Sequence, residues 1–251
     1  MLYLYFSGTG NSKYCIEYFA KGLGDTTNIY SIEDSDAIDK IRQHDDIVFA
    51  YPIYYSTLPK IMSDYIINHS ELWKGKNIFL IATMGLFSGD GTGILARPLK
   101  KYGANIVGGL HLKMPDCIID VKLLKKADDK NREIVDNARK KMDMAIDAYR
   151  HGKYPNEGLH WWNHIAGLFG QRLYFRNKTA NYTDKLKIDA VKCIGCGVCA
   201  AKCPMNNILI EDKKAVGHDR CTMCYRCVSN CPKKAITLIG KKIVAEAFTE
   251  R

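Results

Sequence analysis

The chain has 251 residues, a net charge of +10 and ten cysteines, and 47% of its residues are hydrophobic. This length accommodates one large domain or two modest domains with buried cores, and we expect two. No stretch reaches the ~18 apolar residues of a membrane span, and the start MLYLYF lacks the basic region of a signal peptide, so we expect a cytoplasmic protein without a transmembrane segment.

The positive charge is concentrated in residues 151–251, whereas residues 1–150 are nearly neutral. A basic protein invites a nucleic-acid interpretation. The sequence contains neither a basic helix nor an RNA motif with interleaved aromatic residues, so we expect no nucleic-acid partner.

Residues 1–150 alternate between strand-like and helix-like segments. Apolar, β-branched or aromatic runs predict strands at 2–6, 27–31, 46–51, 77–83 and 105–112. Helix-compatible segments lie near 10–23, 59–70, 91–103 and 127–150. This alternation predicts an α/β domain with a doubly wound five-stranded parallel sheet, in which ligands bind beyond the carboxyl ends of the strands.

The loop FSGTGNSKY follows the first predicted strand and opens the first predicted helix. Its N–H groups and hydroxyls can converge on an anion at the positive end of that helix, and a phosphate is the natural ligand. Lys13 stands where the dinucleotide fingerprint needs its third glycine, and the loop lacks the Gly-Lys-Ser/Thr of nucleotide-triphosphate loops. Neutral donors suit a phosphate monoester, while an ordinary turn with a Thr or Asn helix cap is the alternative. The predicted phosphate-binding residues are Ser7, Gly8, Thr9, Gly10, Asn11 and Ser12.

Three loops together resemble those of the flavodoxin-like FMN-binding proteins. They are FSGTGNS after the first strand, YPIYYSTLP (51–59) after the third and TMGLFSGDGTG (83–93) after the fourth. The resemblance covers residues 1–150 and implies that the first loop binds the FMN phosphate while the other two hold the isoalloxazine ring. It also implies that Tyr54 or Tyr55 stacks on the ring. The ring-binding residues implied in this way are Pro52, Ile53, Tyr54, Tyr55, Thr83, Met84, Gly85 and Phe87.

The alternation stops at residues 151–187, which we interpret as an aromatic and basic linker. Its segment LHWWNHIAGLFGQRLYF (159–175) carries large apolar side chains at mixed spacings. We expect this segment to pack between domains, and a partner or membrane-surface site is the alternative. We assign no chemistry to His160 and His164.

The sequences CIGCGVCAAKCP and CTMCYRCVSNCP form an internal repeat with the pattern C-x2-C-x2-C-x3-C-P. Soft thiolates at this spacing can hold three corners of an iron–sulfur cube while the fourth cysteine reaches the other cluster. Paired zinc sites are the alternative, because C-x2-C occurs in both kinds of site. Cysteines gathered in one segment of a chain without a secretion signal indicate metal ligands rather than a disulfide framework. The predicted ligands are Cys193, Cys196, Cys199, Cys203, Cys221, Cys224, Cys227 and Cys231.

Residues 188–240 closely resemble the bacterial two-cluster ferredoxin domain, a small α+β fold, and residues 241–251 follow as a tail. The resemblance implies that Cys193, Cys196, Cys199 and Cys231 hold one 4Fe-4S cluster. It implies that Cys221, Cys224, Cys227 and Cys203 hold the other. Cys15 and Cys117 lie outside the pattern, and we predict that both are small buried side chains.

The two halves together resemble the fused flavodoxin–ferredoxin proteins of anaerobes. The resemblance implies electron transfer between two 4Fe-4S clusters and FMN in anaerobic redox metabolism, with a ferredoxin-type donor or an acceptor enzyme as partner. The sequence shows neither a second nucleotide-binding unit nor a nucleophile or acid–base constellation, so we assign no catalytic residue. An FMN-dependent reductase of a small substrate and a redox sensor are the alternative functions.

Overall fold

Five parallel strands form the central sheet of the N-terminal region in the computed structural model, which describes all residues except 87–88, 161–184, 247 and 249–251. The strand order is β2-β1-β3-β4-β5, and every pair is parallel. The strands are β1 (Leu2–Tyr5), β2 (Ile29–Ser31), β3 (Asp46–Pro52), β4 (Asn77–Met84) and β5 (Asn105–Lys113). The predicted doubly wound sheet is confirmed, and each strand begins and ends within two residues of its predicted bounds.

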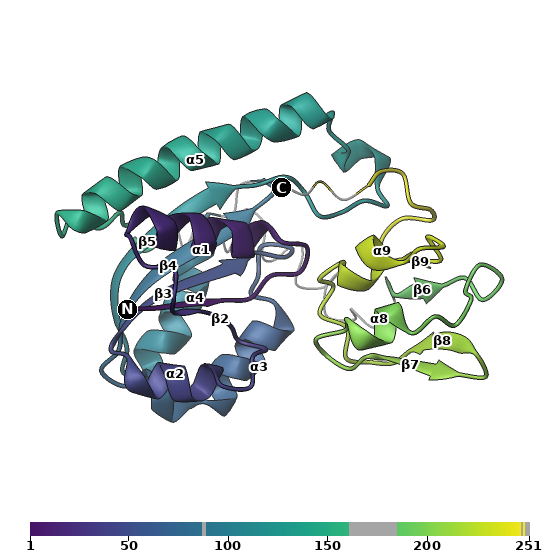
Figure 1. The fold of residues 1–251 in the computed structure, drawn as a ribbon, viewed down its shortest axis with the longest axis horizontal. Helices are drawn as coiled ribbons and strands as arrows, with labels where there is room; N and C mark the ends of the chain where they lie inside the picture. Colours follow the sequence, from purple (N-terminus) through teal and green to yellow (C-terminus); the bar gives the residue numbers. More distant parts are fainter. Residues whose placement is uncertain (87–88, 161–184, 247, 249–251) are drawn as a thin grey trace.

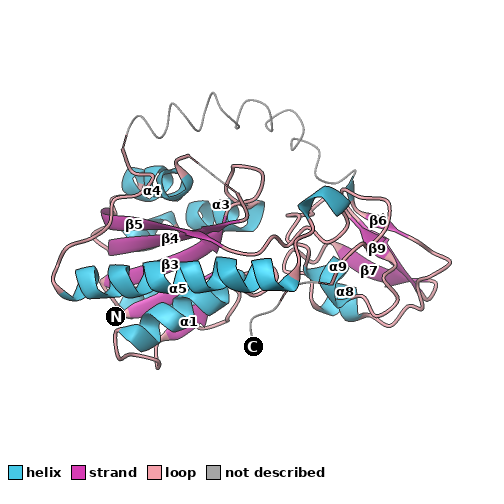
Figure 2. Ribbon diagram, turned by 90° about the horizontal axis from the view of Figure 1, so that it is seen from above, coloured by secondary structure: helices cyan, strands magenta, loops and turns pink. Residues whose placement is uncertain are grey.

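Helices cover both faces of this sheet (Figure 2). They are α1 (Asn11–Gly22), α2 (Ala37–Gln43), α3 (Lys60–Asn68), α4 (Gly91–Lys101) and α5 (Asp128–Arg150), with short 3-10 helices η1 (Ser70–Trp73) and η2 (Lys122–Leu124). Side chains alternate across the strands, so Tyr3 and Phe79 pack beneath α1 and α5, whereas Leu4 and Leu80 join the core beneath α2, α3 and α4. The sequence analysis missed α2, because only Ala37 and Ile41 of its seven residues are buried and the apolar periodicity is weak.

The C-terminal region, which we call the cysteine-rich domain (residues 185–240), is built from two small antiparallel sheets and two short helices. Strand β6 (Lys187–Ile188) pairs with β9 (Ile236–Thr237), and β7 (Ile208–Glu211) pairs with β8 (Lys214–Gly217). Helices α8 (Val198–Ala201) and α9 (Arg226–Asn230) each begin inside one cysteine motif. This is the small α+β arrangement expected for the region.

The cysteine-rich domain lies beyond the carboxyl ends of the parallel strands, beside the loops that follow β1, β3 and β5 (Figure 1). After β1, Gly8 lies against Cys224. After β3, the Ile61 N–H donates to the Thr222 hydroxyl at 3.4 Å. After β5, Asp120 of the connection to α5 accepts three hydrogen bonds from the cysteine-rich domain. The edge of the sheet that binds ligands in such folds is therefore shared by both domains.

The first part of the predicted linker packs along the outer edge of the sheet. The Gly109 N–H of β5 donates to Pro155 O at 2.6 Å, and the Glu157 N–H donates to Gly109 O at 2.9 Å. Lys141 of α5 forms an ion pair with Glu157 at 2.7 Å. We call residues 1–160 the sheet domain, since these contacts tie the chain to it as far as Leu159.

Residues 161–184 of the linker, which include most of the aromatic segment 159–175 and His164, fall outside the described residues. Beyond the cysteine-rich domain the chain returns to the sheet domain, where the Val244 N–H donates to Ile119 O at 2.9 Å. Within the part of the chain that the structure describes, no helix is both long and apolar enough to cross a membrane.

Candidate cofactor sites

The phosphate loop, residues 7–10, joins β1 to the first turn of α1. The Gly10 N–H donates to the Ser7 hydroxyl at 3.1 Å, and the Asn11 side-chain amide donates to Pro115 O at 2.7 Å, which ties the loop to the end of β5. Among the described residues no side chain caps α1, and its first turn contains no acidic residue. The orphan N–H groups of this turn therefore remain for an anion, as the phosphate prediction requires.

Ser12 links the phosphate loop to the third predicted flavin loop. Its side chain is buried, and its hydroxyl lies 2.8 Å from the Thr83 hydroxyl at the end of β4. Thr83 in turn donates to Tyr51 O at 3.4 Å. Two predicted site residues, far apart in sequence, are thus hydrogen-bonded to each other at the floor of one cavity.

A cavity of about 390 Å³, which we call the loop cavity, lies between the predicted flavin loops and the cysteine-rich domain. Every predicted phosphate-binding and ring-binding residue lines it except Gly10 and Phe87. Gly10 lines a neighbouring groove, and Phe87 is outside the described residues. The cavity combines hydroxyl and backbone donors at the phosphate loop with apolar walls beyond it, as a phosphate-bearing aromatic ligand needs.

The two candidate stacking tyrosines occupy a tight turn. Tyr54 and Thr57 form a two-residue hairpin, with N···O distances of 3.1 and 2.9 Å, and the intervening Tyr55 and Ser56 have φ values of 51° and 58°. Positive φ at both turn positions is normally adopted by Gly or Asn, so this turn is strained. Strain of this kind concentrates at ligand-binding sites, where the structure holds a side chain in one place.

The two tyrosines have different surroundings. The Tyr54 hydroxyl lies close to Gly8 of the phosphate loop, and burial raises the pKa of Tyr54 well above its ordinary value, so the hydroxyl stays protonated. Tyr55 is half-buried and packs against the cores of both domains. Tyr54 therefore packs against the phosphate loop, while Tyr55 joins the two domains at the cavity wall.

The connection from β5 to α5 supplies cavity residues that the sequence analysis missed. Asp116 lies against Gly85, and burial raises the pKa of its carboxyl group. Cys117, predicted as a small buried side chain, lines the cavity wall, and burial raises the pKa of its thiol. The segment MPDCIID directly follows the fifth strand, so the rule that ligands bind at the carboxyl ends of parallel strands could have identified it.

The cysteine-rich domain also lines the loop cavity, through Met223, Tyr225 and Ile239. Met223 and Tyr225 have positive φ values of 53° and 61°, and their counterparts in the first motif are Gly195 and Gly197, at 66° and 76°. The two motifs thus have the same positive-φ backbone conformation, with glycines at these positions in the first motif and large side chains in the second. A positive φ strains residues other than glycine, and here both strained side chains face the cavity.

The eight motif cysteines are brought together as two sets of four. The first thiol set, around one small cavity, is Cys193, Cys196, Cys199 and Cys231. The second thiol set, around another, is Cys203, Cys221, Cys224 and Cys227. Each set draws its fourth cysteine from the other motif, which is the crossing that the ferredoxin resemblance implied. Within the described ranges, no three His, Cys, Asp or Glu side chains are grouped to hold a single metal ion.

Backbone N–H groups point at four of these sulfurs. The pairs are Ala215 N with Cys193 Sγ at 3.4 Å, and Asn207 N with Cys203 Sγ, Met223 N with Cys221 Sγ and Ala235 N with Cys231 Sγ, each at 3.3 Å. At Cys193 the N–H groups of Ala215 and Gly195 lower the thiol pKa. In the second thiol set burial raises the pKa of Cys224 to about 12. N–H donors suit thiolates, and a buried thiolate needs a bound cation, so both sets fit iron–sulfur ligation.

The domains are also joined through the buried Asp120 and the half-buried Arg226. The Asp120 carboxylate, from the β5 to α5 connection, accepts the Tyr225 hydroxyl at 2.9 Å and the N–H groups of Leu238 and Ile239 at 2.7 and 3.0 Å. Arg226 pairs with Glu33 of the sheet domain, and this carboxylate raises the pKa of the guanidinium. Neither Asp120 nor Glu33 belongs to a recognisable motif, so only the folded structure reveals them.

Comparisons with known families agree with this division. Residues 2–102 match the model of the flavodoxin domain, and residues 185–232 match that of the 4Fe-4S dicluster domain. No curated protein gives a significant match.

Solved structures similar to this chain include two flavodoxins and a WrbA-like protein. Megasphaera elsdenii flavodoxin is 20% identical, over 56% of this chain and 99% of its own, with a TM-score of 0.41. A flavodoxin from the Archaea is 16% identical, over 60% and 98%, with a TM-score of 0.38. The WrbA-like flavodoxin of Agrobacterium tumefaciens is 16% identical, over 61% and 98%, with a TM-score of 0.40.

The flavodoxin domain implies FMN as a cofactor, and the dicluster domain implies iron–sulfur clusters. Both cofactors serve electron transfer. The chain is therefore a fusion of a flavodoxin domain with a ferredoxin-type 4Fe-4S dicluster domain.

Proposed function

We propose that this protein transfers electrons between two 4Fe-4S clusters and FMN within one molecule, and exchanges them with a separate redox protein. In this proposal the loop cavity holds FMN, and each thiol set holds one cluster. Clusters exchange single electrons whereas FMN accepts one or two, so the fusion links one-electron and two-electron chemistry.

One observation carries the proposal: Tyr225 lines both the loop cavity and the cavity of the second thiol set. Tyr225 is therefore part of the wall of both cavities. Cys224 reinforces this proximity, because its backbone carbonyl lies so close to Gly8 that the glycine has no room for a Cβ atom. The residues proposed to hold the second cluster therefore lie directly beside those proposed to hold FMN.

The hydrogen bonds to Asp120 maintain this proximity. Asp120 is only 3% exposed and receives three donors from the cysteine-rich domain. Burial raises the pKa of Tyr225, so its hydroxyl remains a donor at neutral pH. Because buried donors bind this charged acceptor, separating the domains costs free energy. This supports electron transfer within one docked molecule rather than between two domains that move independently.

The first thiol set is the proposed point of exchange with the partner. Cys196 is exposed, and the neighbouring side chains of Val191 and Ile194 are 93% and 58% exposed. Apolar side chains in water beside a cluster suit a transient protein contact. We propose a ferredoxin-type donor or an acceptor enzyme as the partner that binds there.

The test is anaerobic stopped-flow mixing of the full-length protein, loaded with clusters and FMN, with a reduced low-potential ferredoxin. Cluster absorbance should change first and flavin absorbance second, and the rate of the second phase should not depend on protein concentration. Asp120→Ala should slow that phase without removing a cofactor ligand. A second phase proportional to protein concentration would show two independent carriers on one chain.

The same preparation separates the alternative functions. Sustained consumption of a small electron acceptor in the absence of any protein partner would favour a reductase. A partner affinity that changes with redox state, without turnover, would favour a redox sensor.

A further inference from the structure

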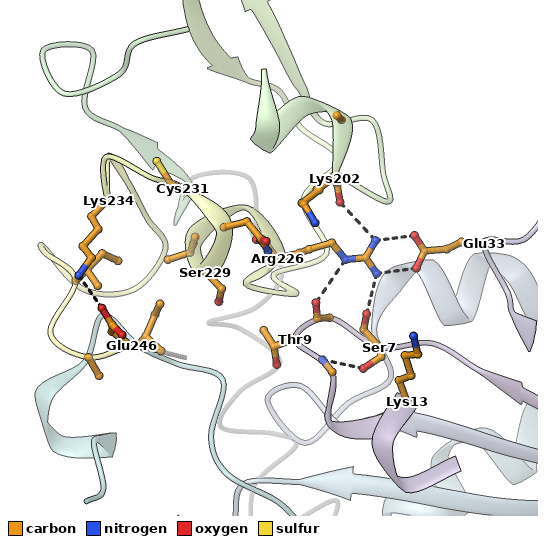
Figure 3. Close-up of a pocket in the computed structure, with 18 of the residues that line it drawn as sticks. Ser7, Thr9, Lys13, Glu33, Lys202, Arg226, Ser229, Cys231, Lys234 and Glu246 are labelled. Carbon is orange, nitrogen blue, oxygen red and sulfur yellow. Dashed lines mark hydrogen bonds and ion pairs between the residues drawn. The ribbon is translucent and has the colours of Figure 1, made fainter. Parts of the chain in front are cut away.

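One arginine of the cysteine-rich domain is bound to the phosphate loop of the sheet domain. Arg226 Nη2 donates to Ser7 O at 2.7 Å, and its Nε donates to Gly8 O at 3.4 Å. The same guanidinium forms a two-pronged ion pair with Glu33, with both N···O distances at 2.7 Å (Figure 3). Its side chain is 19% exposed, and the contact lies in the groove of about 850 Å³ between the domains.

Each of the five N–H donors of this guanidinium has an acceptor. The fifth donor, on Nη1, reaches Lys202 O at 3.4 Å. A planar guanidinium with five N–H donors can bind three backbone carbonyls and a carboxylate at once, and a lysine ammonium cannot reproduce that pattern. Arg226 is therefore held rigidly between the phosphate loop, Glu33 and the residue that precedes Cys203.

The arginine sets the direction of the phosphate-loop amides. In a trans peptide the carbonyl and the N–H point in opposite directions, and no cis peptide occurs in the described part of the chain. Arg226 holds the Ser7 carbonyl on the groove side, so the N–H of the same peptide, that of Gly8, points away from the groove and toward the loop cavity, which Gly8 also lines. The bond to Gly8 O directs the Thr9 N–H in the same way.

The position of Arg226 connects this geometry to the second thiol set. The residue lies between Cys224 and Cys227, and its acceptor Lys202 directly precedes Cys203. The first motif has Val198 at the matching position, so this contact is specific to the motif beside the loop cavity. Loss of the second cluster would free the segment that carries the guanidinium.

We propose that Arg226 is a positioning residue that orients the phosphate-loop amides toward FMN, so that tight FMN binding depends on the docked cysteine-rich domain. This inference rests on the proposed function, because it takes FMN as the ligand. Linkage requires the reverse effect as well, so bound FMN should stabilise the docked, cluster-loaded domain. The Glu33 partner cancels the charge of Arg226, so the effect comes from directed hydrogen bonds rather than from net charge.

The test measures the dissociation constants of FMN and riboflavin for the full-length, cluster-loaded protein by quenching of flavin fluorescence under anaerobic conditions. We expect Arg226→Lys to weaken FMN about tenfold or more while riboflavin changes much less, since only FMN carries the phosphate. Glu33→Gln, which leaves the cysteine-rich domain unaltered, should also weaken FMN binding relative to riboflavin binding, by a smaller factor. Iron content verifies that each variant keeps its clusters.

Lys234→Ala is the matched control, because Lys234 lines the same groove but pairs with Glu246 rather than with the phosphate loop. It removes one positive charge and should leave the ratio of FMN to riboflavin affinity unchanged. Equal weakening of both ligands by Arg226→Lys, or an unchanged ratio, would overturn the inference and leave Arg226 as a docking contact only. Failure of the wild-type protein to bind either flavin would instead overturn the proposed function on which the inference rests.

Discussion

The hydrogen bonds to Asp120 allow a quantitative prediction about how the two domains stay docked. In Asp120→Ala, two backbone N–H groups and the Tyr225 hydroxyl lose their common acceptor inside a buried contact. Three bonds to a charged acceptor, each worth about 1.5 kcal/mol at the low end of the usual range, correspond to about 4.5 kcal/mol of docking free energy. Asp120→Asn keeps an oxygen for the two amides and offers an N–H to the tyrosine oxygen, so we expect a loss of only about 1–2 kcal/mol.

The assay is hydrogen exchange measured by mass spectrometry on the anaerobic, cofactor-loaded protein. At 1.4 kcal/mol per tenfold, exchange of the Leu238 and Ile239 amides should accelerate about 1000-fold in Asp120→Ala and about tenfold in Asp120→Asn. Exchange in the β7–β8 hairpin, which lies in the same domain away from the contact, should not change. Equal protection of these two amides in wild type and Asp120→Ala would refute the reasoning.

Three further predictions concern the proposed cofactors and the cavity. The anaerobically purified protein should contain FMN and about eight irons per chain by metal and flavin analysis, and stoichiometric zinc would contradict the cluster assignment. Cys203→Ala should chiefly damage the cluster of the second thiol set and Cys196→Ala that of the first, which electron paramagnetic resonance can distinguish; the opposite selectivity would refute the crossed ligands. Burial raises the pKa of the Asp116 carboxyl, so its ionisation lowers the stability of the folded protein as pH rises through and above the ordinary carboxyl range. Asp116→Asn should therefore raise the melting temperature at neutral pH, and the difference from wild type should disappear in acid. A difference in melting temperature that does not depend on pH would show that ionisation of Asp116 is not the cause.

The sequence by itself determined the layers of the sheet domain and the nature of its ligand-binding edge. The three inner strands β1, β3 and β4 are buried on both faces and form short apolar runs, so strands such as Asn77–Met84 could be located from composition alone. The loop predicted to bind phosphate was identified for a similar reason, because glycines and hydroxyls directly after a buried strand are typical of anion-binding loops. The cysteine repeat could also be identified from the sequence, since the spacing of cluster ligands follows the shape of the cluster that they bind.

Only the tertiary structure decided which thiol set lies beside the loop cavity. The two motifs have the same cysteine spacing, and the difference lies in Met223 and Tyr225, which occupy positive-φ positions where the first motif has glycines. Their significance depends on a surface supplied by the sheet domain, more than 100 residues away in sequence in the case of Asp120 and Tyr225. The pairing of Arg226 with Glu33 and Ser7 is of the same kind. Side chains that meet across a domain interface need no shared spacing or composition, because docking rather than local chain geometry brings them together.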